Sequence, residues 1–364
     1  MKTANDALKA AFDPDAFRAE AHRVVDLLAD YLRQARSGDL PVLPWVPPEE
    51  LAPRWPARFP QKGGGDLPAL LHRVVEEANH LHHPRFVGHQ VSAPLPSTAL
   101  CDMVSALLNN GMAIYEMGPS ATAMEKAVLA WMAERLGLPA SAGGVLTSGG
   151  SAGNLTALLA ARQAKAGFNV WDEGASGGPP LAILVADQAH YCVERSARMM
   201  GLGAGGVVKV PVDPAFRMRA DLLPEAFDKA TREGRRVFAV VASACSTATG
   251  AFDPLEPIAD FCQARGLWLH VDGAHGASAV LSPRHRGLLR GVERADSVVW
   301  DAHKMMMTPA LVTAVLFREA RRSFEAFAQE ASYLYDEARA GHDEWNVGTR
   351  TLECTKRMMG LKLY

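Results

Sequence analysis

The sequence predicts an α/β fold in which a mainly parallel sheet of seven strands lies between helices and follows an N-terminal helical segment. From Gly143 onward, seven short and nearly continuous apolar runs alternate with helical patterns. Such runs are typical of strands whose sheet is covered on both faces. The residues before Gly143 show helical periodicity, interrupted by a Pro- and Trp-rich connector and a His-containing loop.

Composition narrows the class of protein. The chain has 364 residues, of which 48% are hydrophobic, enough for one large domain or two. A net charge of -2 gives no electrostatic reason to expect nucleic acid or a membrane surface as a partner. No apolar run approaches the roughly 18–20 residues that span a bilayer. The five cysteines are scattered without a CxxC pair, so we expect a cytoplasmic protein without a metal site or a disulfide framework.

Residues 1–96 are expected to form a helical and extended segment. Apolar residues fall at helical spacing in "AHRVVDLLADYLRQA", and a second helix is predicted over "LPALLHRVVEEANHL". Between them, "LPVLPWVPPEELAPRWPARFPQKGGGD" carries Trp and Phe residues that are expected to cover another surface. A single α/β core cannot cover all these apolar residues. We therefore expect a homodimer in which this segment contacts the second subunit.

Residues 97–350 are expected to form the large domain. A helical pattern runs from about Ser97 to Leu136. The strand-like runs that follow are "GVLT", "LAILVAD", "VVKVPV", "VFAVVAS", "LWLHVD", "SVVW" and "LVTAVLF". Residues 351–364 end in an apolar helical pattern without a Gly cap or a Pro stop, and they predict the start of a truncated C-terminal domain.

Polar residues follow five of the strand-like runs, in "TSGGS", "DQAH", "SACST", "HVDGAH" and "WDAHK". Ligands of open parallel sheets bind at the C-terminal ends of the strands. The first of these segments, "TSGGSAGN" (147–154), also opens a helix, whose free N–H groups, glycines and serine hydroxyl would form a phosphate cradle. It matches neither a Walker A loop nor GxGxxG, and an ordinary Gly-rich turn is the alternative.

Two further polar residues, Asp272 and His190, are candidates for the same site. Asp272 ends an apolar strand and shares a face with His270 by the period of two. Its carboxylate could cap a loop, bind a metal with His270 and His275, or keep a ring nitrogen cationic. No second cluster at ligand spacing supports the metal. His190 lies just beyond another strand, where a structural and a functional role are both open.

Lys304 lies in "WDAHKMMMTP", where an apolar stretch begins. A lysine is costly to bury unless it is paired or used covalently. One cofactor needs a phosphate cradle, an acid for a pyridinium nitrogen, a stacking group and an amine that forms an imine: pyridoxal 5'-phosphate. The combination therefore predicts this cofactor, with Lys304 as the amine. A surface lysine at a strand end is the alternative.

From about residue 16 to 364 the chain resembles the group II pyridoxal-phosphate amino-acid decarboxylases, which include the glutamate, cysteine-sulfinate and aromatic L-amino-acid enzymes. The segments that carry the resemblance are "HPRF", "DQAHYCVERSA", "GAFDPLEPIADFCQARGLWLHVDGAHGASA", "GVERADSVVWDAHKMM" and "ASYLYDE". The resemblance implies a fold-type I, aspartate-aminotransferase-like large domain in a homodimer. It also implies decarboxylation of an L-amino acid to the amine and carbon dioxide through a Lys304 Schiff base.

The resemblance also implies a role for individual residues. Asp272 would pair with the pyridine nitrogen, His190 would stack on the ring, and Tyr333 would protonate the reaction intermediate from a mobile loop. Gln90 and Ser92 match substrate-side positions. The cofactor-binding residues that the resemblance implies are Lys304, Gly149, Gly150, Ser151, His190, Thr247, Asp272, Ala274 and His303.

The sequence departs from this family in three places. Asp301 and Ala302 stand where relatives often have Asn-Pro, and Gly273 and His275 stand where they often have alanine and an aromatic residue. The family also carries a C-terminal small domain of roughly a hundred residues beyond the point where this sequence ends. The substrate stays open among acidic, diamino and aromatic amino acids. The alternatives are another fold-type I enzyme, such as an aminotransferase or a carbon–carbon lyase, and an inactive cofactor-binding relative.

Overall fold

The computed structural model of the protein describes residues 4–55, 65–327 and 344–364. The chain divides into two compact units, residues 1–89 and residues 90–364. We call them the smaller and the larger unit. The boundaries expected from the sequence, at residues 96 and 350, stay predictions.

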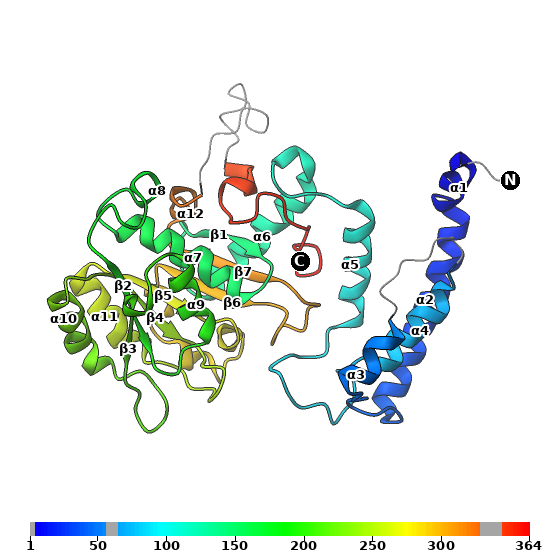
Figure 1. The fold of residues 1–364 in the computed structure, drawn as a ribbon, viewed down its shortest axis with the longest axis horizontal. Helices are drawn as coiled ribbons and strands as arrows, with labels where there is room; N and C mark the ends of the chain where they lie inside the picture. The colour runs from blue at the N-terminus through cyan, green and yellow to red at the C-terminus, as the bar shows by residue number, and fades with distance from the viewer. Residues whose placement is uncertain (1–3, 56–64, 328–343) are drawn as a thin grey trace. The chain divides into compact units, whose positions relative to one another are not determined.

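The smaller unit is helical, as the sequence predicts. Its helices are α1 (Ala4–Ala11), α2 (Pro14–Ser37), α3 (Pro48–Leu51) and α4 (Leu67–Glu77) (Figure 1). Asp13 caps α2 by accepting hydrogen bonds from the N–H groups of residues 15 and 16, and α2 ends at Gly38, which adopts φ 85°. Large apolar side chains stay exposed in this unit, including Phe12 at 80% and Trp45 at 72%. The smaller unit therefore has apolar surface available for a partner.

The larger unit contains, in its described part, a sheet of seven strands in the order β1-β7-β6-β5-β4-β2-β3. The strands are β1 (Gly143–Thr147), β2 (Leu181–Ala186), β3 (Val207–Val210), β4 (Arg236–Ser243), β5 (Trp268–Asp272), β6 (Ser297–Asp301) and β7 (Thr313–Phe317) (Figure 1). The five neighbouring strands β6, β5, β4, β2 and β3 are parallel to one another. Strand β7 is antiparallel to both of its neighbours, β1 and β6. The predicted mainly parallel sheet is confirmed. The C-terminal ends of all strands except β7 lie at one edge.

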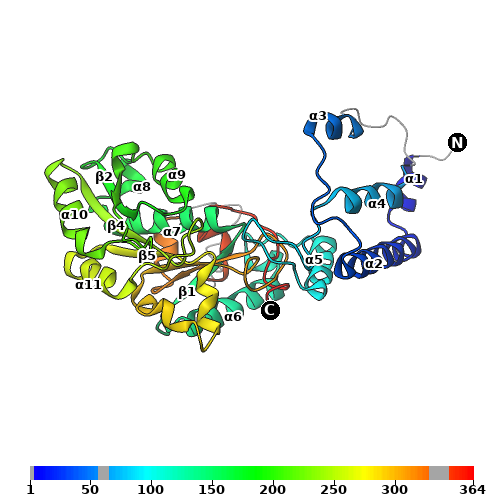
Figure 2. The ribbon, with the colours of Figure 1, turned by 90° about the horizontal axis from the view of Figure 1, so that it is seen from below.

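Helices cover both faces of this sheet (Figure 2). One face carries α7 (Gly150–Lys165), α8 (Val170–Glu173), α9 (Tyr191–Met199) and α12 (Arg322–Glu325). The other face carries α6 (Pro119–Arg135), α10 (Leu223–Arg232) and α11 (Leu255–Arg265). The helical pattern expected from about Ser97 to Leu136 forms two helices, α5 (Pro96–Leu108) and α6. They are separate because Asn109 adopts φ 48° and ends α5.

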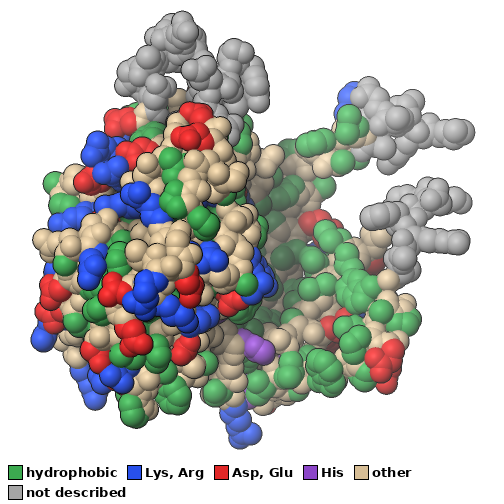
Figure 3. Space-filling model, turned by 60° about the vertical axis from the view of Figure 1, so that its left-hand side comes forward, with side chains coloured by type: hydrophobic (Ala, Val, Ile, Leu, Met, Phe, Trp, Pro, Cys, Tyr) green, Lys and Arg blue, Asp and Glu red, His purple; other side chains and the backbone are tan. Residues whose placement is uncertain are grey.

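The surface of the larger unit mixes charges of both signs, as Figure 3 shows for one face. Lys and Arg side chains lie among Asp and Glu side chains there, without a broad patch of one sign. Among the described helices, none is long and apolar enough to cross a bilayer.

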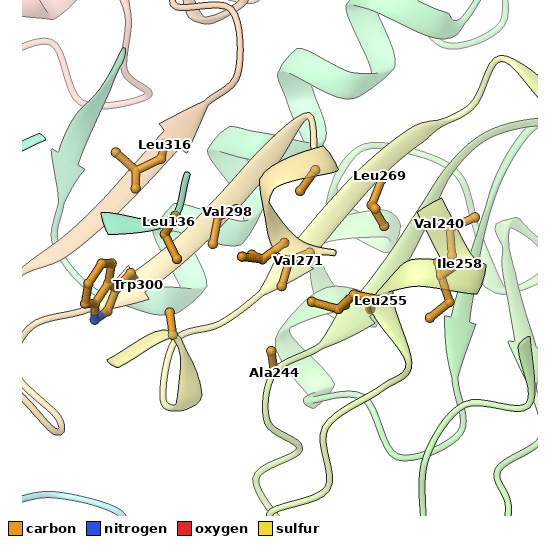
Figure 4. Close-up of a cluster of buried hydrophobic side chains, with 14 of the residues drawn as sticks. Leu136, Val240, Ala244, Leu255, Ile258, Leu269, Val271, Val298, Trp300 and Leu316 are labelled. Carbon is orange, nitrogen blue, oxygen red and sulfur yellow. The ribbon is translucent and has the colours of Figure 1, made fainter. Parts of the chain in front are cut away.

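Side chains of β5 alternate between the two faces of the sheet, and this alternation decides which face Asp272 points to. In β5, Leu269 and Val271 point to the face of α11, where they pack near Leu255 (Figure 4). The alternate residues Trp268, His270 and Asp272 therefore point to the face of α7. Because Asp272 is the last residue of β5, its carboxylate reaches the edge where the C-terminal strand ends meet.

The end of the chain differs from the helical pattern of its sequence. Residues 355–364 are not helical in the described structure. Lys356 is buried, with Nζ 2.5 Å from Glu125 Oε1 and 2.6 Å from the Leu146 carbonyl oxygen. Burial lowers the pKa of Lys356, and the Glu125 charge opposes that shift. The helix expected from the sequence does not form here. The C-terminal segment instead makes an ion pair with α6, and such tertiary contacts can outweigh helical propensity.

Candidate active site

A pocket opens in the larger unit where the C-terminal ends of β1, β2, β4, β5 and β6 meet. Each cofactor-binding residue expected from the sequence lines it: Gly149, Gly150, Ser151, His190, Thr247, Asp272, Ala274, His303 and Lys304. Sequence reasoning did not assign a role to several other lining residues, among them Ser148, Asn154, Cys192, Cys245 and Asp301. All of them lie in or beside the polar segments at strand ends, which is the signal that could have identified them.

The turn from β1 into α7 has the features of an anion cradle. Gly149 adopts φ 112°, a conformation that a residue with a side chain rarely adopts, and α7 begins at the next residue. A Cβ atom on Gly150 would lie 3.0 Å from Asp301 Oδ2, so the backbone approaches its neighbours closely. The N–H groups of the first turn of α7 have no partners within the helix. This geometry fits the phosphate group of the predicted cofactor.

Asp272 and His190 both line this pocket. Asp272 is buried, and its Oδ1 accepts a hydrogen bond from the N–H group of Ala274 at 3.2 Å. His190 caps α9, and its Nδ1 accepts from the N–H group of Cys192 at 3.3 Å. Burial lowers the pKa of His190, although the nearby Asp272 charge opposes this shift. A neutral imidazole with its proton on Nε2 is a suitable stacking partner for an aromatic ring.

His270 supports this arrangement from the core. It is fully buried, with Nδ1 2.8 Å from Ser297 Oγ and Nε2 2.8 Å from Asn154 Oδ1. Asn154 Nδ2 in turn donates to the Gly150 carbonyl oxygen at 2.9 Å. Desolvation lowers the pKa of His270 to about 4, so the ring is neutral near pH 7. Both ring nitrogens are therefore used in joining β5 to α7 and β6, which favours a structural role over metal binding.

Lys304 reaches the pocket from the segment after β6. Its Nζ lies 3.2 Å from Asp301 Oδ2. Asp301 is the last residue of β6 and is buried, and its Oδ1 accepts a hydrogen bond from Thr313 Oγ1 at 2.6 Å. The Nε2 atom of His303 lies 3.6 Å from Asp301 Oδ2. The pocket thus holds a second carboxylate besides Asp272, directly beside the Lys304 amine.

The remaining sequence-predicted residues lie around the pocket or outside the described residues. Gln90 Nε2 donates to the Thr247 carbonyl oxygen at 2.8 Å, and Ser92 Oγ donates to the Lys304 carbonyl oxygen. Both side chains therefore hold the backbone of lining residues. Tyr333 lies outside the described residues.

His275 also lines the pocket. Its Nδ1 atom is buried and has no hydrogen-bond partner among the residues that the structure describes. Burial lowers the pKa of His275, and the positive charge of Lys304 adds to the effect. The pocket therefore offers a largely neutral imidazole to a ligand.

Comparisons with known proteins agree with this chemistry. The family model described as "Pyridoxal-dependent decarboxylase conserved domain" matches residues 48–364. The acidic amino acid decarboxylase GADL1 of Bos taurus is 34% identical over 327 residues, and the match covers 89% of this chain and 62% of that protein. The human cysteine sulfinic acid decarboxylase is 32% identical, with coverage of 97% and 72%. The chain thus spans about two thirds of the length of these relatives.

Solved structures also resemble this chain in fold. The crystal structure of mouse CSAD has a TM-score of 0.87 at 31% sequence identity, with coverage of 96% of this chain and 73% of that one. The crystal structure of Oryza sativa TDC with PLP and tryptamine has a TM-score of 0.85 at 26% identity, with coverage of 97% and 74%. The predicted fold-type I class is confirmed by these neighbours.

Proposed function

The chain belongs to the pyridoxal-dependent decarboxylase family, and we propose from this premise that it removes the α-carboxylate of an amino acid as carbon dioxide. The observation that carries the proposal is the convergence of Lys304, Asp272 and His190 with the start of α7 in one pocket. Bound there, pyridoxal 5'-phosphate supplies a conjugated ring that takes up the electron pair left when carbon dioxide departs.

The residues of the chain have separate tasks in this proposal. The turn at Gly149 and Gly150 and the N-terminal N–H groups of α7 hold the phosphate. Asp272 keeps the ring nitrogen protonated, and its burial strengthens that interaction. His190 stacks on the ring, and Lys304 supplies the amine that anchors the cofactor. We further propose that Tyr333 delivers a proton to the α-carbon after the carboxylate has left.

Acidic amino acids are the first substrates to test. Two relatives, GADL1 and the cysteine sulfinic acid decarboxylase, name acidic substrates, whereas an aromatic-L-amino-acid decarboxylase of Bacillus atrophaeus is similar at 30% identity. Lys304 is the one lysine or arginine among the described lining residues. Because the cofactor engages that amine, an acidic side chain needs another cation. A second subunit could supply it.

A homodimer is the oligomeric state that we propose. It is supported by α5, which exposes Leu100, Leu107 and Leu108 at 52%, 67% and 57%, and by the exposed apolar residues of the smaller unit. An apolar surface of this kind is usual at subunit interfaces. We also propose a cytoplasmic location, supported by cysteines that are all free in the described structure. Cell fractionation would test the location.

A screen of carbon dioxide release tests the proposed activity. The purified protein, loaded with cofactor, is incubated with each proteinogenic amino acid, with cysteine sulfinate and with 2,4-diaminobutyrate. We expect one class to release carbon dioxide together with an equal amount of the amine. Formation of the keto acid without carbon dioxide would instead identify an aminotransferase. Absence of any product would contradict the proposal.

A further inference from the structure

We propose that Asp301 is a positioning residue for Lys304, and that the ion pair between them has to open before Lys304 can anchor the cofactor. The inference concerns the binding of the cofactor and does not depend on the proposed decarboxylation. It rests on the partners of the Asp301 carboxylate, on the way the backbone of Lys304 is held, and on the closeness of Asp301 to the phosphate cradle.

The two carboxylate oxygens of Asp301 have different partners. Oδ1 accepts a hydrogen bond from Thr313 Oγ1 at 2.6 Å, which ties the end of β6 to the start of β7. Oδ2 faces Lys304 Nζ at 3.2 Å and His303 Nε2 at 3.6 Å. The Asp301 side chain is only 2% exposed, and a buried carboxylate is stable only with hydrogen-bond donors or positive charges around it. Lys304 is therefore the principal partner of Oδ2.

The backbone of Lys304 is fixed, so its side chain is the part that can move. Its N–H group donates to the Asp301 carbonyl oxygen at 3.4 Å, and its carbonyl oxygen accepts from the N–H group of Met307 at 3.1 Å and from Ser92 Oγ. The Lys304 side chain keeps 21% of its surface exposed. An amine attacks an aldehyde only in its neutral form. The ion pair with Asp301 at 3.2 Å is made by the ammonium form of Lys304, so the pair has to open before a neutral Nζ can reach the aldehyde.

The same carboxylate lies against the cradle. A Cβ atom on Gly150 would lie 3.0 Å from Asp301 Oδ2 and 3.2 Å from Oδ1. The first turn of α7, which starts at Gly150, is where the cofactor phosphate is expected. Two negative groups repel each other strongly in a pocket of low dielectric constant. Asp301 therefore opposes entry of the phosphate and also holds the Lys304 amine away from the cofactor.

Replacing Asp301 by asparagine tests the proposal. Asp301→Asn keeps the shape of the side chain and an oxygen for Thr313, but it removes the charge that holds Lys304. In the apoprotein of this variant, we expect formaldehyde and cyanoborohydride to methylate Lys304 about fivefold faster than in the wild type. A rate ratio of this size corresponds to the free energy of one partly exposed ion pair. Peptide mass spectrometry gives the rate relative to Lys209, whose ion pair with Glu194 at 3.4 Å includes no pocket-lining residue and does not involve Asp301.

The kinetics of cofactor binding give a second measurement. Uptake of pyridoxal 5'-phosphate, followed by its visible absorbance, should become faster in Asp301→Asn, while the rate of release changes less. Thr313→Val is the matched control, because it removes the partner of Oδ1 and leaves the charge of Asp301 in place. We expect both rates in this control to stay near those of the wild type.

Three results would overturn the proposal. The first is unchanged methylation of Lys304 relative to Lys209 in Asp301→Asn. The second is unchanged uptake with faster release, which would make Asp301 a stabiliser of the bound cofactor. The third needs no variant and applies if Asp301→Asn does not fold: it is methylation of Lys304 in the wild-type apoprotein at least as fast as that of Lys209. None of these measurements requires decarboxylation, so their failure would leave the proposed activity untouched.

Discussion

At the scale of single residues, Lys304 and Asp272 reach one pocket from neighbouring strands. Lys304 follows β6, Asp272 ends β5, and these strands are parallel partners in the sheet. An amine and a carboxylate therefore face the same pocket. Each residue gives a prediction that concerns the cofactor itself, and each can be tested before the substrate is known.

The first prediction is that Lys304 carries the cofactor. Borohydride reduction of the loaded protein should fix the cofactor to the peptide that contains Lys304, as found by mass spectrometry. Lys356 is the internal control, because it is buried and its Nζ is held by Glu125 and the Leu146 carbonyl oxygen. Labelling at any lysine other than Lys304 would disprove the assignment.

The second prediction concerns the charge of Asp272. Asp272→Ala should weaken cofactor binding and lower the rate of carbon dioxide release by about a hundredfold or more, because the ring nitrogen loses the charge that keeps it protonated. Spectroscopic titration and the release assay measure the two effects. Asp187→Ala is the control, since this exposed aspartate follows β2 but is not among the pocket-lining residues. Near-normal release in Asp272→Ala would show that the ring is activated in another way.

At the scale of secondary-structure elements, the start of α7 decides whether the phosphate can bind. Gly150→Ala should weaken binding of the cofactor by about tenfold or more, because the added methyl group would lie 3.0 Å from Asp301 Oδ2 and within the cradle. Gly287→Ala is the matched control, since nothing lies within 4 Å of the position of its Cβ atom. Equal cofactor affinity in the two variants would remove α7 from the phosphate site.

The junction of β5 with α7 predicts how stability depends on pH. His270 has a pKa of about 4 in the folded protein, below its ordinary value of 6.5. Between these values the unfolded chain binds more protons, so the free energy of unfolding should fall as the pH drops from about 6.5 toward 4. The loss attributable to His270 is on the order of 3 kcal/mol at most. Denaturant unfolding at pH 7 and pH 5 measures it, and His270→Gln should reduce the difference.

Sequence reasoning predicted the elements better than the contacts between side chains. All seven strands were found because a strand covered on both faces is a continuous apolar run. The antiparallel direction of β7 was not predicted, since a run of apolar residues carries no information on direction. The pairing of Lys304 with Asp301 was also missed. A lysine side chain has many rotamers, and the sequence alone does not decide between Asp301 and Asp272 as its partner.

At the scale of the whole molecule, the exposed apolar surface of α5 is connected to the pocket. Helix α5 belongs to the same unit as the pocket, and the backbone just before it joins the segment after Lys304, because the N–H group of Leu95 donates to the Met307 carbonyl oxygen at 2.8 Å. Met305 and Met307, in that segment, are 49% and 43% exposed. A subunit that covers α5 would therefore also approach the pocket. This is why we expect cofactor affinity to depend on assembly.

The last prediction is that a charge on α5 separates the subunits and weakens cofactor binding together. Leu107 is 67% exposed on α5, so Leu107→Lys removes little packing within the subunit. It places a charge in the proposed interface, where burial without a partner is unfavourable. Light scattering should give twice the chain mass for the wild type and one chain mass for the variant at micromolar concentration, with weaker cofactor binding by spectroscopic titration. Leu288→Lys, at a residue that is 47% exposed outside α5, should change neither. A wild-type monomer that binds the cofactor tightly would contradict both the dimer and its link to the pocket.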